Sequence, residues 1–373
     1  MKYYHVTLLF LIVSFIASCN LNVASEKTLK DVFKDKFHIG VALSLDQIDG
    51  KDSLSLKIVE SHFSSIVAED CMKSMYVQPL EGEFNFSEAD RFVAFGEQKN
   101  MHIVGHALIW HSQAPKWFFI DEKGDNVSRE VLIERMRRHI TSLVKHYKGA
   151  VKGWDVVNEA ILEDGSYRNS KFYEIIGEDF IPLAFQFAHE ADPNVELYYN
   201  DYNEWYEGKR NAIVKMIQTF KERGIRIDGV GMQGHMDMDS PSLDEYEAAI
   251  EAYANAGVKV MITEWDISAL PSPWGQTSAN ITDTIAYRKE MNPYTAGLSQ
   301  DVEEAWEKRY LDFFKLFLKH QDKIDRVTLW GVTDNDSWKN DFPVHGRMDY
   351  PLLFDRNHQA KPIVHKLIQM VGE

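Results

Sequence analysis

The chain of 373 residues is short of positive charge and of cysteine. Its 41 Lys and Arg residues face 57 Asp and Glu residues, which gives a formal net charge of −16 at pH 7. This balance disfavours nucleic acid and anionic membrane faces as partners and favours neutral or weakly charged ones. The only cysteines are Cys19 and Cys71, and we expect Cys71 to be a small buried hydrophobic residue.

Long apolar runs are also scarce, and the main one spans residues 6–18. It is too short for a transmembrane helix and suits the core of a signal peptide. It ends in the residues IASC at 16–19, which resemble the bacterial lipobox and imply cleavage before a lipidated Cys19. We therefore expect a lipoprotein signal peptide at 1–18 and a tether at 19–30. The alternative is an ordinary signal peptide that happens to contain a cysteine.

A lipid on Cys19 would leave Cys71 as the only thiol, so no intramolecular disulfide is expected. The protein would be exported across the inner membrane and anchored at the outer membrane or cell surface, with the periplasmic side as an alternative. No other apolar run approaches spanning length, so this anchor would be the only membrane contact. We expect a monomer.

Residues 31–373 contain no repeats, proline-rich linkers or low-complexity tracts, which predicts one domain. Short β-rich segments alternate with amphipathic stretches at 129–147, 209–223, 243–256 and 302–319. The helix at 243–256 has Ser242 as a candidate N-cap and Gly257 near its end. Eight candidate strands predict a single (β/α)8 barrel, with a doubly wound open sheet as the alternative: 37–42, 65–67, 102–107, 153–157, 196–199, 229–234, 259–263 and 326–330.

Polar and aromatic side chains gather at or just after the carboxyl ends of seven of these strands. That rim is where active sites are built in a barrel, so the ring favours the barrel over the open sheet. Its members are Asp70, Lys73, His106, Trp110, Asn158, Glu159, Asn200, Tyr202, Gln233, His235, Glu264 and Trp330.

Two glutamates in the ring end apolar strands: Glu159 closes WDVVNE and Glu264 closes VMITE. The fourth and seventh strands face each other across a barrel mouth, so the two carboxyl groups could flank one bond. Glycoside hydrolysis needs this arrangement, and a separation of about 5–5.5 Å lets one carboxylate attack directly with retention of configuration. A surface salt bridge is the alternative for either glutamate taken alone.

The neighbouring residues favour the catalytic interpretation. Asn158 could hydrogen-bond a sugar 2-hydroxyl, and His235 could pair with Asp266 and keep Glu264 ionised and oriented. Glu159 would have to carry a proton, which the negative charge of Glu264 would help to hold. Asp266 as a helix cap and His235 as a core residue are the alternatives.

Aromatic residues favour a sugar ligand, because flat apolar rings pack against the C–H faces of pyranoses. Trp110, Trp330 and Trp338 lie at the predicted rim, with Tyr202 and Trp117 beside them. Burial in the core is the alternative for each tryptophan, above all for Trp117.

These motifs resemble glycoside hydrolase family 10, the (β/α)8 endo-xylanases. The similarity runs from FHIGVAL at 37–43 to LLFDRNHQAKP at 352–362 and includes GHALIWHSQAPKW at 105–117, WDVVNEA at 154–160, YYNDYN at 198–203, GVGMQGHM at 229–236, ITEWDIS at 262–268 and LWGVTDNDSW at 329–338. The resemblance implies cleavage of internal β-1,4 bonds in xylan and xylo-oligosaccharides, with retention through a covalent intermediate and without a metal or organic cofactor.

The resemblance also implies residue roles. Glu159 would be the acid/base and Glu264 the nucleophile, oriented by His235 with Asp266 behind it. The reactive sugar in the −1 site would contact Asn158, Gln233, His106 and Trp110, above Trp330 and beneath Trp338. Glu69, Asp70, Lys73 and Gln113 would hold the −2 sugar, and Tyr202 would lie on the leaving-group side.

The sequence departs from the family after the second strand. Members usually read Glu-Asn-x-Met-Lys-Trp there, whereas residues 69–74 read EDCMKS. Asp70 cannot donate to a sugar hydroxyl as Asn does, but it can pair with Lys73. Glycone binding is therefore expected to differ from that of a typical member. A long segment, Leu270 to Gln300, could shape the aglycone side or simply pack on the barrel.

Two other functions remain open at this stage. A different β-glycan specificity, such as mixed-linkage glucan or cellobiosides, would use the same catalytic groups. A surface glycan-binding lipoprotein without catalysis would be expected to lack one catalytic carboxylate, and both are present here.

Overall fold

The computed structural model describes residues 27–272 and 289–372. The expected signal peptide, the lipidated Cys19 and most of the tether lie outside the described residues. So do residues 273–288 of the segment from Leu270 to Gln300, which include Trp274 and Tyr287.

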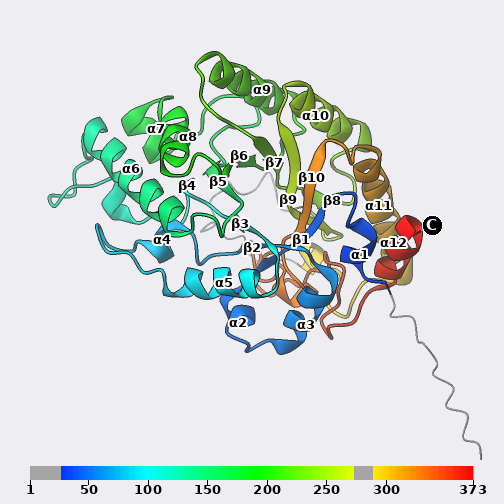
Figure 1. The fold of residues 1–373 in the computed structure, drawn as a ribbon. Helices are drawn as coiled ribbons and strands as arrows, with labels where there is room; N and C mark the ends of the chain where they lie inside the picture. The colour runs from blue at the N-terminus through cyan, green and yellow to red at the C-terminus, as the bar shows by residue number, and fades with distance from the viewer. Residues whose placement is uncertain (1–26, 273–288, 373) are drawn as a thin grey trace, which may run out of the picture.

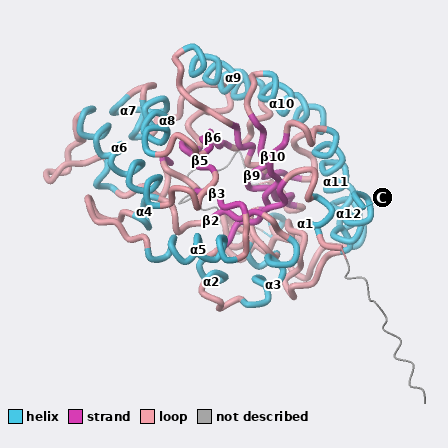
Figure 2. Tube along the Cα trace, in the orientation of Figure 1, coloured by secondary structure: helices cyan, strands magenta, loops and turns pink. Residues whose placement is uncertain are grey.

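Eight parallel strands form a closed barrel, in which β9 and β10 pair to complete the ring β10–β1–β2–β3–β5–β6–β7–β9. Figure 2 shows these strands at the centre of the molecule with helices around them. The predicted (β/α)8 barrel is therefore confirmed. The strands are β1 (His38–Leu43), β2 (Ser65–Ala68), β3 (His102–Gly105), β5 (Gly153–Asn158), β6 (Glu196–Asp201), β7 (Gly229–Met232), β9 (Lys259–Ser268) and β10 (Ile324–Leu329).

Two short strands extend the barrel at its carboxyl end. Strand β4 (Ile109–Trp110) pairs with β5, and β8 (His235–Asp237) pairs with the last residues of β9, so that His235 lies opposite Asp266. The strand predicted at 259–263 was therefore too short, because β9 gains a second partner beyond the rim. The strands predicted at 102–107 and 229–234 were too long, because the chain leaves the ladder to form β4 and β8.

Helices cover the outside of the barrel, and α1 packs beside α12 where the two ends of the described chain meet (Figure 1). None of the helices among the described residues is long and apolar enough to cross a membrane. The helices are α1 (Leu29–Phe33), α2 (Leu45–Ile48), α3 (Ser53–His62), α4 (Ser74–Val77), α5 (Ser87–Gln98), α6 (Arg129–His146), α7 (Lys171–Ile176), α8 (Phe180–Ala191), α9 (Glu207–Glu222), α10 (Leu243–Asn255), α11 (Gln300–Lys319) and α12 (Pro362–Gly372), with 3₁₀ turns at Lys116–Phe118, Lys289–Met291 and Asp334–Asp336.

Local sequence signals set the ends of α10, as expected. The Ser242 hydroxyl accepts a hydrogen bond from the Glu245 N–H, and the Glu245 carboxylate accepts one from the Ser242 N–H, which forms a capping box. At the other end, Gly257 has a φ of 78°, a conformation that glycine adopts without strain.

The hydrophobic core has two layers. The larger layer lies between the barrel and the helices, and a smaller cluster fills the barrel itself: Ala42, Val67, Val104, Tyr198, Met261 and Trp330. The Tyr198 ring takes the space beside Gly153, where a Cβ would lie 2.2 Å from it. The filled barrel makes a rigid floor beneath the residues at the rim.

Candidate active site

The carboxyl ends of the barrel strands open onto a cleft with a volume of about 1200 Å³. Nearly all of the predicted site residues line it: Glu69, Asp70, Lys73, His106, Trp110, Gln113, Asn158, Glu159, Tyr202, Gln233, His235, Glu264, Trp330 and Trp338. The exceptions are Asp266, which is buried behind His235, Asn200, which is buried beneath the floor of the cleft, and Trp117. The structure thus brings together residues from seven separate stretches of the chain.

Side-chain amides bridge the two buried glutamates. Asn200 Nδ2 donates to Glu264 at 2.8 Å, and Gln233 Nε2 donates to Glu159 at 3.0 Å. The amide of Asn158 lies between them, 2.9 Å from that of Asn200 and 3.2 Å from that of Gln233. Both carboxyl groups are therefore held on the same small region of the cleft floor. The amide bridge itself was not predicted from the sequence, which pointed to Asn158 and Gln233 only as contacts of the reactive sugar.

Glu159 has an unusual backbone. Its φ of 58° lies in the left-handed region, which typically costs about 1–3 kcal/mol for a residue with a side chain. Two hydrogen bonds hold this conformation: the Glu159 N–H donates to the Asn200 carbonyl at 2.9 Å, and Arg168 Nε donates to the Glu159 carbonyl at 2.8 Å. Arg168 also donates to the Tyr202 hydroxyl at 2.6 Å. No sequence signal singled out Arg168, because its role depends on a loop that returns to the rim.

A buried ion pair lies beneath this loop. Lys209 and Asp201 are fully buried and 2.9 Å apart, and Lys209 also donates to the Tyr202 carbonyl at 2.7 Å. Asp201 in turn accepts from the Tyr199 hydroxyl and from the N–H of Ile161. The pair therefore connects the chain after Glu159 to the end of β6.

His235 contacts both Glu264 and Asp266. Its Nε2 lies 3.2 Å from Glu264, and its Nδ1 lies 2.7 Å from Asp266. Burial alone would lower the pKa of His235, but the charge and hydrogen bond of Asp266, together with Glu264, raise it to about 9. With both ring nitrogens protonated, His235 donates to both carboxylates. The predicted His235–Asp266 pair is present.

The charged form of Glu264 is favoured. Burial acts to raise its pKa, but the hydrogen bond from His235, the nearby His106 and the hydrogen bond from Asn200 outweigh burial and hold the pKa below its usual value. Glu264 is therefore a carboxylate at neutral pH, as a nucleophile must be.

Lys73 organises the other end of the cleft. Its ammonium donates to Asp70 at 3.0 Å and to Gln113 at 2.8 Å, and it lies 4.9 Å from the centre of the Trp110 ring. The predicted Asp70–Lys73 pair is present. Burial, followed by the negative charge of Asp70, raises the pKa of Glu69 to about 7.

The tryptophans divide between the cleft and the core. Trp330 lies between His106 and His235, with ring centres 5.4 and 6.5 Å away. Trp338 lies against His235 and donates to Asp266 at 2.8 Å. Trp117 was wrongly expected at the rim: it stacks on Phe118 and donates to the Gln78 carbonyl, because the chain turns away from the cleft before it.

One of the cleft histidines has a partner that the sequence analysis missed. His106 Nδ1 lies 2.9 Å from Asp155, which is buried within β5. A charged residue inside an otherwise apolar strand, WDVV, was the signal that could have revealed it.

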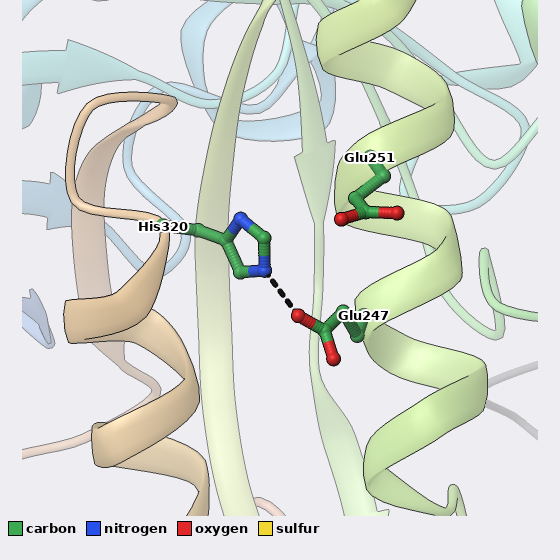
Figure 3. Close-up of side chains that lie close together, drawn as sticks. All are labelled: Glu247, Glu251 and His320. Atoms are coloured by element: carbon green, nitrogen blue, oxygen red, sulfur yellow. Dashed lines mark hydrogen bonds and ion pairs between the residues drawn. The ribbon is translucent and has the colours of Figure 1, made fainter.

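Among the described residues, one group has a spacing that could hold a metal ion: Glu247, Glu251 and His320, between α10 and α11 (Figure 3). Lys319 already pairs with Glu247 at 2.6 Å, and Lys323 lies 3.1 Å from His320 Nδ1. Because an ammonium only donates, Nδ1 accepts and Nε2 carries its hydrogen toward Glu247, 2.5 Å away. Nε2 then has no lone pair for a metal, and the group acts as an ion-pair network between the helices.

Residues 28–370 match the model of glycosyl hydrolase family 10. The chain belongs to this family. It is 49% identical to endo-1,4-beta-xylanase A of Xylanibacter ruminicola over 346 residues, which cover 93% of this chain and 94% of that protein. It is 40% identical to an endo-1,4-beta-xylanase of Geobacillus stearothermophilus over 93% of this chain and 99% of that protein.

Solved structures of family 10 members have the same fold as this chain. A GH10 endoxylanase retrieved from a sugarcane soil metagenome is 47% identical, with a TM-score of 0.87 over 93% of this chain and 100% of that one. The intracellular xylanase of Thermoanaerobacterium saccharolyticum, solved with xylotriose, is 35% identical, with a TM-score of 0.79 over 92% of this chain and 99% of that one. The predicted family is thereby confirmed.

Proposed function

We propose that this chain is a retaining endo-β-1,4-xylanase that cuts xylan and xylo-oligosaccharides by double displacement. The names of its family 10 relatives support the substrate. The observation that carries the mechanism is the ionised Glu264, held by a cationic His235 and connected to Glu159 through three amides.

In the first step, Glu264 attacks the anomeric carbon while Glu159 gives its proton to the departing glycosidic oxygen. The bond to the leaving chain breaks, and an ester to Glu264 forms. In the second step, Glu159 takes a proton from a water molecule, whose oxygen attacks the same carbon and releases Glu264. Glu159 ends protonated again, so the proton balance closes over one cycle.

The amides of Asn158 and Gln233 serve the reactive sugar, because hydrogen bonds to its 2-hydroxyl strengthen as the transition state gains oxocarbenium character. Trp330 forms the floor of the −1 site with His106 and Trp110 beside it, and Trp338 covers the glycone side. The −2 sugar contacts Glu69, Asp70, Lys73 and Gln113, and the leaving group passes Tyr202.

The N-terminal motif IASC supports a lipid anchor on Cys19, after removal of residues 1–18 and before a tether at 19–30. A catalytic domain at 31–373 would then act as a monomer at the outer membrane or cell surface, within reach of polymeric substrate. Metabolic labelling with a radioactive fatty acid tests this proposal, since label should enter the wild type and not Cys19→Ala.

Activity on a panel of β-glycans tests the function. Xylan should be cut internally, giving a ladder of short xylo-oligosaccharides at early times, and NMR should detect the β-anomer as the first product. Glu264→Gln should lose at least about 10⁴-fold in rate while keeping its fold, whereas Glu190→Gln, at an exposed position on α8, should match the wild type. The proposal fails if Glu264→Gln stays active, if the α-anomer appears first, or if glucan is cut faster than xylan.

A further inference from the structure

Lys339 is a buried lysine beside the active site that lies outside the lining of the cleft. It follows Trp338, and its ammonium lies 3.1 Å from Asp266 Oδ1. The other oxygen of Asp266 accepts from Trp338 Nε1 at 2.8 Å and lies 2.7 Å from His235 Nδ1. Lys339 thus begins a continuous chain of contacts that passes through Asp266 and His235 and ends at Glu264.

The charges around Lys339 keep it cationic. Burial would lower the pKa of Lys339, but Asp266, Asp237 and Asp349 outweigh burial and raise it. Two arginines also lie near these aspartates, but neither acts on Asp266: Arg347 faces Asp349 and Asp237, and Arg309 faces Asp239 and Asp237. Lys339 is therefore the cation that Asp266 meets on the side away from His235.

Asp266 depends on this cation. Burial would raise the pKa of Asp266, but Lys339, His235 and Trp338 together lower it to about 2. Of these three residues, Lys339 lowers the pKa of Asp266 the most. A buried carboxylate that loses one of its partners keeps its desolvation cost without the attraction that offset it.

We propose that Lys339 is a positioning residue for the nucleophile: its ammonium fixes the orientation and charge of Asp266, which keeps His235 directed at Glu264. The inference rests on the proposed function, in which Glu264 attacks the sugar. Lys339 itself touches neither the substrate nor the reacting carboxylate. It acts through two side chains, over hydrogen-bond distances of 3.1, 2.7 and 3.2 Å.

Replacing this cation has two separable effects. Lys339→Met removes the charge and the donor, so Asp266 loses both its partner at Oδ1 and part of its fixed orientation. Lys339→Gln removes the charge but offers a neutral donor in nearly the same place. Lys339→Arg keeps the charge. Any shift in titration shared by Met and Gln but absent from Arg therefore reports the charge.

The expected results concern titration and rate. With one positive charge fewer near Glu264, its pKa should rise, and the acidic limb of kcat/KM should move up by about half a pH unit or more. The other groups that face Glu264 are His235, His106, Asn200 and, across the amide bridge, Glu159, and none of them is substituted in these variants. In Lys339→Met, misdirected His235 should also lower kcat by about tenfold to a hundredfold.

Lys361→Met is the matched control. Lys361 is also a buried lysine paired with a buried aspartate, Asp334, at 2.9 Å, but it makes no contact with Asp266 or His235. Its loss should lower stability to a similar degree and leave the pH profile of kcat/KM in place. An aryl β-xylobioside with a good leaving group is the substrate, because its first step depends little on Glu159.

NMR titration of His235 provides a readout that does not depend on activity. Loss of Lys339 should raise the pKa of His235 above the value of about 9 in the wild type, because Asp266 then acts on His235 without a competing cation. The inference is overturned if Lys339→Met and Lys339→Gln keep the wild-type titration of His235 and lose only stability. If the wild type cuts no xylan, the proposed function fails. The titration of His235 still shows whether Lys339 acts on His235 through Asp266.

Discussion

The Asp70→Asn substitution tests how the glycone end of the cleft is charged. Burial raises the pKa of Glu69 from 4.5 to about 7, with help from the negative charges of Asp70 and Asp336, while Lys73 acts in the opposite direction. Asn at position 70 removes the like charge that raises the pKa of Glu69 most and can still accept from Lys73. A like charge at this range contributes on the order of one pKa unit, so the pKa of Glu69 should fall by about one.

The sign of the stability effect follows from proton binding. Between pH 4.5 and pH 7, Glu69 is protonated in the folded chain and ionised in the unfolded chain, so rising pH favours unfolding. The stability that protonated Glu69 contributes is fully present below pH 4.5 and is lost as the pH rises through 7. A pKa difference of about 2.5 corresponds to about 3 kcal/mol, and Asp70→Asn should reduce this free energy by about 1 kcal/mol.

Urea unfolding at pH 5 and pH 8 measures this contribution in the wild type, Asp70→Asn, Glu69→Gln and the double variant. The wild type should lose more stability between the two pH values than Asp70→Asn, and Glu69→Gln should lose least. In the Glu69→Gln background, Asp70→Asn should change the pH dependence little. The reasoning would be refuted if the wild type and Asp70→Asn lost the same free energy of unfolding between pH 5 and pH 8. It would also be refuted if Glu69→Gln lost as much as the wild type.

Three further predictions concern stability and reactivity. Lys209→Met should lower the free energy of unfolding by about 3–5 kcal/mol, because Asp201 would stay buried without its cation; a loss below about 1 kcal/mol in urea unfolding would contradict this. Burial raises the pKa of Cys71 to about 12, so the native chain should resist iodoacetamide at pH 8 while the urea-unfolded chain reacts; rapid labelling of native protein would count against it. Ser242→Ala should cost about 1 kcal/mol through loss of the α10 cap, and an unchanged Tm would argue against that cap.

The sequence predicted those parts of the site that depend on position along a strand. Glu159 and Glu264 follow apolar runs, and parallel strands in a barrel bring their carboxyl ends to one rim. The pairing of His235 with Asp266 was predictable because family motifs place both beside Glu264. The ends of the strands were less predictable, since β4 and β8 depend on how the chain leaves the barrel.

Contacts between stretches that lie far apart in the chain could not be predicted from the sequence pattern. Arg168 and Lys339 come from loops whose return to the rim is set by tertiary packing rather than by local periodicity. The left-handed backbone of Glu159 carries no sequence signal, because the residue type there is set by chemistry. The prediction for Trp117 was wrong because local sequence was misleading there: its neighbours resemble a site motif, while its own ring packs on Phe118.

The central claim is that Glu264 becomes covalently bound to the sugar. Incubation with a 2-deoxy-2-fluoro-xylobioside that carries a good leaving group should trap this ester, because fluorine slows both steps and the leaving group rescues the first. Mass spectrometry of the digested protein should find one added fluoroxylobiosyl group, on the peptide that contains Glu264. Rapid turnover with no labelled protein, or a label on Glu159, would contradict the account.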